Sequence, residues 1–345
     1  MDLSIAAILG LDGLTNGAIY ALVALALVLV FSVTRVIFIP QGEFVAFGAL
    51  TLAALQLGRV PGTVWLLLIM AAAVTALDLL AAWRERWPAA RLARRLLKTL
   101  LGPLLAAGAS AALAAHQPPL LVQVLLTLAV VTAMGPLLYR LAYRALSGAS
   151  VLTLLIVSVG VHFALTGIGL VFFGAEGYRT PAFWDASFAL GPLQLSGQTL
   201  IIFAASLALL LAMAWFFGRT LAGKALRATS VNRTGARLMG ISGDSAGALS
   251  FTMAAFIGAL SGLLISPSTT IYYDTGFLIG LKGFVGAVFG GLASFPLALA
   301  GAVGVGLIES FGSFWASAFK EVIVFTAILP VLLWRSFVDP HHEEH

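Results

Sequence analysis

The sequence predicts an all-α, polytopic helical membrane protein with about nine to eleven transmembrane segments, some of them short or broken and rich in glycine. Of its 345 residues, 61% are hydrophobic and only 10% are charged, and the mean hydropathy is +1.05. A soluble domain carries about 25% charged residues, so a chain this apolar needs lipid as its solvent. Its apolar runs are continuous over about 20 residues, as in membrane-crossing helices, whereas the strands of a membrane β-barrel alternate apolar and polar residues.

The first part of the chain contains five predicted spans. The first run is long enough to form a broken or partly re-entrant helix. A Gly-Glu pair opens the second run, and the basic sequence WRERWPAARLARRLLK (83–98) separates the third from the fourth. The spans predicted here are 5–33, 41–58, 62–83, 98–115 and 119–139.

The remaining spans are predicted from the apolar runs that follow. The glycine runs GAVFGG (286–291) and GAVGVG (301–306) allow close contact between helices. Because no strand precedes it, GAVGVG does not indicate a nucleotide-binding loop. The pair around 279–313 is short enough for half-helices instead of full crossings. The spans predicted here are 151–173, 199–217, 246–266, 279–293, 296–313 and 320–335.

Basic residues predict the orientation. Lys and Arg concentrate in 83–98, 139–144 and 219–237, and they are almost absent from 116–119, 174–198 and 266–276. By the positive-inside rule the first group is cytoplasmic. About eleven crossings then place the N-terminus outside and the C-terminus in the cytoplasm. Asp2 stands where a signal peptide would have Lys or Arg, so no cleavage is expected. With no cysteine, disulfides and thiolate sites are excluded.

A cationic segment, GKALRATSVNRTGARLMGIS (223–242), lies between two apolar runs and contains no acid. Its spacing predicts one short amphipathic helix over 228–239, with Leu238 and Met239 on the apolar face and Gly240 as the stop. The pattern alone fits two interpretations. The helix either lies on the membrane surface against anionic headgroups or docks a soluble partner.

Several blocks of the sequence resemble the branched-chain amino acid ABC transporter permeases. The likeness covers about 13–60 and 135–335 and includes the cationic segment, which is similar to the loop through which these permeases contact their ATPases. The blocks are GLTNGAIYALVALALVLVFSVTRV (13–36), GEFVAFGAL (42–50), LYRLAYRALSGASVLTLLIVSVG (138–160), GKALRATSVNRTGARLMGIS (223–242) and GLKGFVGAVFGGLASFPLALAGAVGVGLIES (280–310).

The resemblance implies a single permease domain over 1–345, in a bacterial inner membrane, that forms half of a pore. Its expected partners are a second related permease, a pair of cytosolic ATPases and an external substrate-binding protein. The chain has no phosphate-binding loop, so it is expected to be no enzyme and to bind no cofactor or metal. Segment 218–245 is the expected ATPase-coupling loop, with these contact residues: Arg227, Arg233, Arg237, Leu238, Met239 and Gly240.

The expected substrate is a branched-chain or related amino acid. Urea, short amides, small aromatic acids and sugars are alternatives, and a stand-alone secondary transporter is the alternative from another class. Two departures from the family bear on this. The family's polar Asn-Phe-Ala-His-Gly run is replaced by Phe38-Ile39-Pro40-Gln41-Gly42 before Glu43. An insertion at 84–130 adds a hairpin, which we interpret as peripheral to transport.

Polar residues inside predicted spans are candidates for the translocation path, because polar groups are costly there. His162 is expected to form an interhelical hydrogen bond, Glu43 is placed either in the path or near Arg35, and Lys282 is expected to snorkel. The tail residues His341, His342 and His345 are expected to be solvated. The path candidates are Thr15, Asn16, Gln41, Glu43, Ser158 and His162, and the candidate contacts for the binding protein are Tyr178, Arg179 and Trp184.

Overall fold

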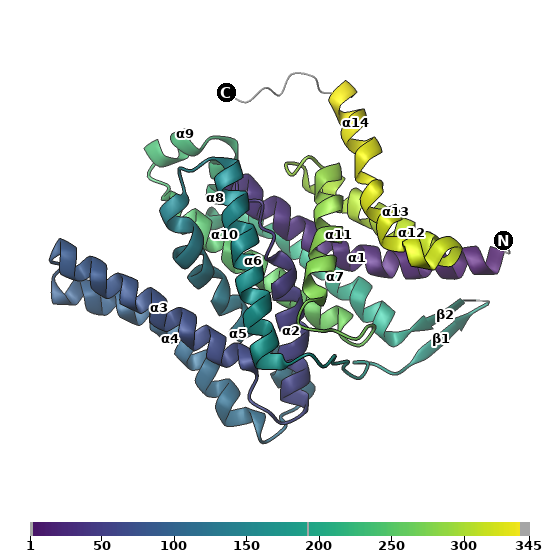
Figure 1. The fold of residues 1–345 in the computed structure, drawn as a ribbon, viewed down its shortest axis with the longest axis horizontal. Coiled ribbons are helices and arrows are strands. Elements are labelled where there is room, and N and C mark those ends of the chain that lie inside the picture. Colours follow the sequence, from purple (N-terminus) through teal and green to yellow (C-terminus); the bar gives the residue numbers. More distant parts are fainter. Residues whose placement is uncertain (1–2, 192, 339–345) are drawn as a thin grey trace.

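The computed structural model describes residues 3–191 and 193–338, so the histidines of the tail lie outside the described residues. The described chain is mainly helical, with one β-hairpin between α6 and α7 (Figure 1). The elements are α1 (Leu3–Thr34), α2 (Gln41–Gln56), α3 (Gly62–Glu85), α4 (Ala89–Ala114), α5 (Leu120–Leu138), α6 (Val151–Phe173), β1 (Ser187–Leu190), β2 (Leu193–Ser196), α7 (Gly197–Arg219), α8 (Leu221–Val231), α9 (Arg233–Leu238), α10 (Gly243–Ile265), α11 (Thr275–Phe289), α12 (Phe295–Ala316), α13 (Lys320–Thr326) and α14 (Ile328–Val338).

Within residues 3–191 and 193–338, eight helical stretches are long and apolar enough to cross a membrane, which confirms the predicted polytopic helical class. The other two apolar helices of the core, α2 and α11, are shorter, with 16 and 15 residues. The last predicted span, 320–335, is not one helix, because α13 ends at Thr326 and α14 begins at Ile328.

The basic sequence 83–98 was predicted to be a loop, and this was wrong for most of its length. α3 continues to Glu85 and α4 begins at Ala89, so only residues 86–88 connect them. Pro88 holds the extended backbone that precedes α4. The Ala, Leu, Arg and Lys residues that follow are strong helix formers. The cations of this sequence therefore lie mainly along the first turns of α4.

Asp78 joins the α3–α4 hairpin to the segment that follows α5, a π-helical turn η1 (Tyr139–Tyr143). Its buried carboxylate accepts hydrogen bonds from Arg140 Nη2 at 2.6 and 2.7 Å and from Arg95 Nε at 2.9 Å. Arg140 Nη1 also donates to Thr99 Oγ1 on α4 at 2.8 Å. A buried charge needs partners of this kind. In Figure 1, α3 and α4 run side by side and project at the left beyond the other helices.

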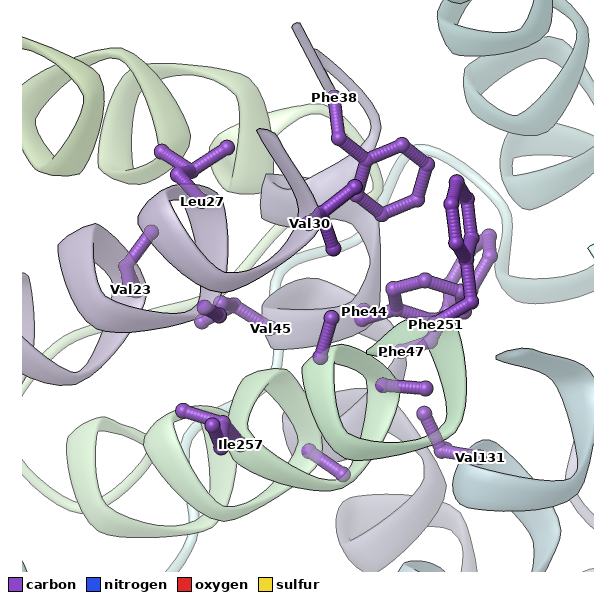
Figure 2. Packing of buried hydrophobic residues seen from close by; sticks show 14 of the residues in the cluster. Val23, Leu27, Val30, Phe38, Phe44, Val45, Phe47, Val131, Phe251 and Ile257 are labelled. Carbon is purple, nitrogen blue, oxygen red and sulfur yellow. The ribbon is translucent and has the colours of Figure 1, made fainter. Parts of the chain in front are cut away.

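The centre of the protein is built around α1. Residues Ile19–Val30 are buried on every side, as expected for a helix that is apolar all round. Figure 2 shows Val30 of α1 near an aromatic cluster to which Phe38 and Phe251 belong, with ring centroids 4.7 Å apart. Phe38 is therefore part of the core. In lipid such packing, more than transfer from water, holds helices together.

Glycine allows α1 and α12 to approach closely. A Cβ on Gly306 would overlap the carbonyl oxygen of Gly13 and the backbone nitrogen of Gly17. A Cβ on Gly304, in the same GAVGVG run, would meet nothing within 4 Å. The run therefore has a packed side and an open side, and only the packed side requires glycine.

We expect the variant Gly306→Ala to destabilise the chain by about 1–3 kcal/mol, because the added methyl group forces the two backbones apart. Gly304→Ala is the matched control and is expected to be neutral or slightly stabilising, because Ala favours the helix over Gly by about 1 kcal/mol. Thermal unfolding of the purified variants in detergent measures both effects. Equal melting temperatures for the two variants would contradict this account of the α1–α12 contact.

Candidate functional site

The predicted coupling segment, 218–245, contains two short helices. Asn232 separates α8 from α9 with an extended backbone (φ −148°, ψ 101°), and its Oδ1 accepts a hydrogen bond from Gly235 N at 2.8 Å. The prediction of one helix over 228–239 was therefore wrong, because Asn232 caps α9 instead of continuing α8. Gly240, with φ of 83°, follows the end of α9, as the sequence predicts.

Large apolar side chains occupy the outer side of α8 and α9. The opposite side is buried through Leu226, Thr229 and Ala236. α9 lies at one end of the molecule, at the upper left of Figure 1. A group of large exposed apolar side chains marks a surface that contacts a partner or lipid. We call these residues, which are 82–86% exposed, the apolar surface: Leu221, Val231, Leu238 and Met239.

The arginines of this segment differ in where they point. Arg227 and Arg237 are exposed. Arg233 is partly buried, and its Nη2 donates to the carbonyl oxygen of Val33, near the end of α1, at 2.7 Å. Burial, followed by the charges of Arg35 and Arg237, lowers the pKa of Arg233 below its ordinary value. Arg233 was expected to face a partner, but the structure uses it to tie α9 to α1.

A second group of predicted residues meets between α2, α6 and α11. His162 Nδ1 lies 2.6 Å from Glu43 Oε1, which confirms the interhelical hydrogen bond expected of His162. The His162 ring also stacks on Phe277 with centroids 4.4 Å apart. Glu43 pairs with His162 and not with Arg35, so that alternative was wrong. Glu43 Oε2 is buried and has no hydrogen-bond partner among the described residues.

The other path candidates do not all join this pair. Ser158 lies one turn before His162 on α6 and bonds Tyr143 through its hydroxyl at 3.1 Å. Gln41 Nε2 donates to the carbonyl oxygen of Ala254 at 3.0 Å. Thr15 Oγ1 bonds the carbonyl of Leu11 in its own helix at 2.8 Å. Asn16, next to Thr15 in α1, is partly buried.

The structure adds a buried charge network that the sequence did not predict. Lys282 Nζ on α11 lies 2.6 Å from Glu309 Oε1 on α12 and 3.0 Å from Glu321 Oε1 on α13. The hydroxyl of Tyr20 on α1 donates to Glu309 Oε2 at 2.5 Å. Lys282 is 5% exposed, so the expectation that it snorkels was wrong. The network could have been predicted from the opposite charges that lie in successive apolar helices, because charged residues inside a membrane pair with one another.

The loop between α6 and α7 folds against the loop between α10 and α11. Tyr178 and Ile271 exchange backbone hydrogen bonds of 2.9 and 2.8 Å. Arg179 Nε donates to the carbonyl of Pro267 at 2.9 Å. Trp184 is 46% exposed and packs edge-on against Phe188 of β1. Of the two aromatic residues among the predicted contacts, Trp184 is more exposed than Tyr178. The β1–β2 hairpin is a local addition to the predicted all-α fold.

No group of His, Cys, Asp and Glu suited to a metal ion is found in residues 3–191 and 193–338. The arrangement instead offers two features that can serve transport. One is a terminal apolar surface on α8 and α9, which the Arg233–Val33 hydrogen bond ties to α1. The other is a set of charged groups paired across helices inside the bundle.

Residues 101–333 match the family described as "Branched-chain amino acid transport system / permease component". The chain is similar to the high-affinity branched-chain amino acid transport system permease protein BraD of Pseudomonas aeruginosa, with 26% identity over 338 residues, which are 94% of this chain and 92% of BraD.

Two further similarities were found. The permease protein LivH of the Escherichia coli high-affinity branched-chain amino acid transport system is 27% identical over 211 residues, 59% of this chain and 68% of LivH. Among solved structures, PsaBC from Streptococcus pneumoniae in complex with Fab aligns with a TM-score of 0.43 at 10% identity, over 95% of this chain and 91% of that one.

Proposed function

The chain belongs to the family of branched-chain amino acid transport system permease components, and from this membership we propose that it forms half of the translocation pathway of a binding-protein-dependent ABC importer for branched-chain or related amino acids. The names of BraD and LivH support the substrate class, since both are permease proteins of high-affinity branched-chain amino acid systems. The chain itself carries no phosphate-binding loop, so ATP hydrolysis belongs to partner subunits.

The observation that carries the coupling role is the apolar surface of α8 and α9. It consists of four large side chains held outside the bundle, and exposed Arg227 and Arg237 belong to the same two helices. A groove on an ATPase that accepts a short helix needs apolar anchors with a charged margin. We propose that Leu238 and Met239 are the anchors and that both arginines pair with acids around the groove.

Motion of the ATPases would reach the bundle through three connections. α8 follows α7 after Thr220, α9 leads into α10, and Arg233 bonds the end of α1. The salt bridge of 2.8 Å between Arg144 Nε and Asp244 Oδ2 also ties the start of α10 to the segment after α5. Packed helices respond to such a displacement by rigid-body switching, which exposes the path to each side in turn. The buried pair Glu43–His162 is our candidate for a group along that path.

The partners follow from the same proposal. A second, related permease completes the pore, a pair of ATPases binds α8 and α9 in the cytosol, and a binding protein delivers substrate outside, where Trp184 is exposed. This orientation places the N-terminus outside and, with α13 and α14 together counted as the last crossing after α12, the C-terminus in the cytoplasm of a bacterial inner membrane.

The orientation predicts the labelling of a single cysteine. The native chain has none, so Ala90→Cys, an exposed position at the start of α4, reports its own side of the membrane. In intact cells we expect a membrane-impermeant thiol reagent to leave Cys at this position unmodified and to label Gln117→Cys in the α4–α5 turn. Labelling at position 90 from outside would contradict the orientation.

Co-purification tests the proposed function most directly. The tagged chain, purified from mild detergent, is expected to bring ATPase subunits and a second permease with it. Reconstituted in vesicles with its binding protein, the complex is expected to take up leucine, isoleucine or valine only when ATP is present on the cytoplasmic side. A chain that purifies alone and transports in response to an ion gradient would instead identify a secondary transporter.

A further inference from the structure

We propose that the α3–α4 hairpin, with the neighbouring ends of α5 and α10, binds the phosphate headgroup of an anionic phospholipid in the cytoplasmic leaflet. Of the proposed function, this inference uses only the cytoplasmic placement of this end of the hairpin. It gives the insertion at 84–130 a role, although the sequence suggested a peripheral hairpin without one.

The site is an open cavity of about 920 Å³. One wall is the face of α4 from Arg91 to Pro103, and another is the end of α5 with the η1 turn that follows it. The third is the start of α10 around Asp244 and Ser245. The cavity therefore lies between the α3–α4 hairpin and the helices of the bundle, and the Asp78 network described above holds the hairpin in this place.

The charge around the cavity is strongly positive. Positions 91, 94, 95 and 98 fall on one face of α4, since residues three and four apart are neighbours on a helix. Arg140 and Arg95 share Asp78, and Arg144 is paired with Asp244. Arg94 and Lys98 are exposed and form no ion pair within the described part of the chain. The six cations that line the cavity are Arg91, Arg94, Arg95, Lys98, Arg140 and Arg144.

The surroundings of these cations favour a lipid over a small soluble anion. Trp87 lies under Arg91, with the guanidinium carbon 4.4 Å from the ring centroid, and Trp83 nearby on α3 is 80% exposed. Tryptophans concentrate at the level of the headgroups. Further along α4 the lining becomes apolar at Gly102 and Pro103, opposite Leu137 of α5. The cations can bind the phosphate diester of a phospholipid headgroup, and the apolar wall can contact its acyl chains.

The leaflet supplies such a ligand. The cytoplasmic surface of a membrane is rich in anionic lipid, and basic pockets between transmembrane helices on that side bind anionic headgroups. Each Lys or Arg near an anionic surface strengthens the binding of anionic lipid. The loss of two such residues is expected to weaken that binding by about 20- to 30-fold. Arg94 and Lys98 are the residues to test, because neither takes part in the Asp78 network.

The experiment uses the purified permease complex in lipid nanodiscs. Phosphatidylcholine discs are prepared with increasing phosphatidylglycerol, and native mass spectrometry counts the phosphatidylglycerol molecules that stay bound. The double variant Arg94→Gln with Lys98→Gln is compared with Arg219→Gln with Lys224→Gln, which removes the same charge from exposed cytoplasmic residues outside the cavity. We expect the first variant to require about 20- to 30-fold more phosphatidylglycerol for equal occupancy, and the second to behave as the parent.

Two results would overturn the proposal. In the first, both double variants retain phosphatidylglycerol as the parent does. In the second, glycerol-1-phosphate added to pure phosphatidylcholine discs binds the complex as tightly as phosphatidylglycerol does, which would identify a soluble phosphate as the ligand. Circular dichroism and thermal unfolding confirm that the variants are folded. Because lipid retention is measured without ATP or substrate, failure here is distinct from failure of the transport proposal.

Discussion

Replacing both Leu238 and Met239 with Asp is expected to abolish assembly of the permease with its ATPases. The two side chains are 84% and 83% exposed at the outer end of α9, so the substitutions leave the bundle unchanged while placing charges in an apolar contact. Loss of an interface hot spot costs about 2 kcal/mol or more, which is over tenfold in affinity. Binding of the ATPases to the detergent-solubilised permease, followed by ATP-driven uptake, measures the effect.

The matched control is Thr234→Asp with Ser242→Asp. It adds the same charge to exposed residues of the same segment, and Asp is accepted at both positions because it suits the beginnings of helices. We expect this control to assemble normally. Normal assembly of the Leu238 and Met239 variant would instead favour a helix that lies on the membrane surface.

The structure also shows which arginines can be reversed to test the charged rim of the proposed ATPase contact. Arg233 is bonded to Val33, so its reversal would disturb the fold itself. Arg227→Glu with Arg237→Glu changes only exposed charges. An exposed ion pair contributes about 0–1 kcal/mol, so this variant is expected to weaken ATPase binding far less than the Asp pair does. If the arginine variant instead lost more ATPase binding than the Asp pair does, the arginines would be the anchors of the contact.

Removal of Lys282 is expected to give the largest loss of stability. Lys282→Met leaves Glu309 and Glu321 close together without the cation that both contact at 2.6 and 3.0 Å. Removing one partner of a buried ion pair costs about 3–5 kcal/mol, because the remaining charge is buried and unpaired. Thermal unfolding of the purified chain in detergent measures the loss, which should appear as a much lower melting temperature.

Lys320→Met is the matched control for this network. Lys320 is 3.9 Å from Glu321, and its side chain is 42% exposed, so solvent replaces most of what it contributes. Its removal is expected to change stability by less than about 1 kcal/mol. The network would not be an anchor of α11, α12 and α13 if both variants melted at the same temperature. Adding Glu309→Gln to Lys282→Met should recover part of the loss, since one unpaired charge is then gone.

Part of the candidate site was predictable from local pattern. Leu238 and Met239 stood out as apolar residues in a cationic segment, and both are exposed at the C-terminal end of α9. His162 was expected to bond another helix, and its partner is Glu43. The break at Asn232 was missed because the apolar spacing continues through it, while a capping side chain changes the backbone at a single residue.

By itself, the sequence determined the helical membrane class, the family, the position of most helices and the segment that contains the apolar surface. These depend on hydropathy and helix propensity, which are properties of neighbouring residues. Only the tertiary structure decided that Arg233 points inward, that Lys282 is buried, and that the α3–α4 hairpin borders a basic cavity together with α10. The contact between Tyr20 and Glu309 spans 289 positions of the chain. Such pairs are set by how the helices pack across the bundle, and hydropathy along the chain carries no record of that packing.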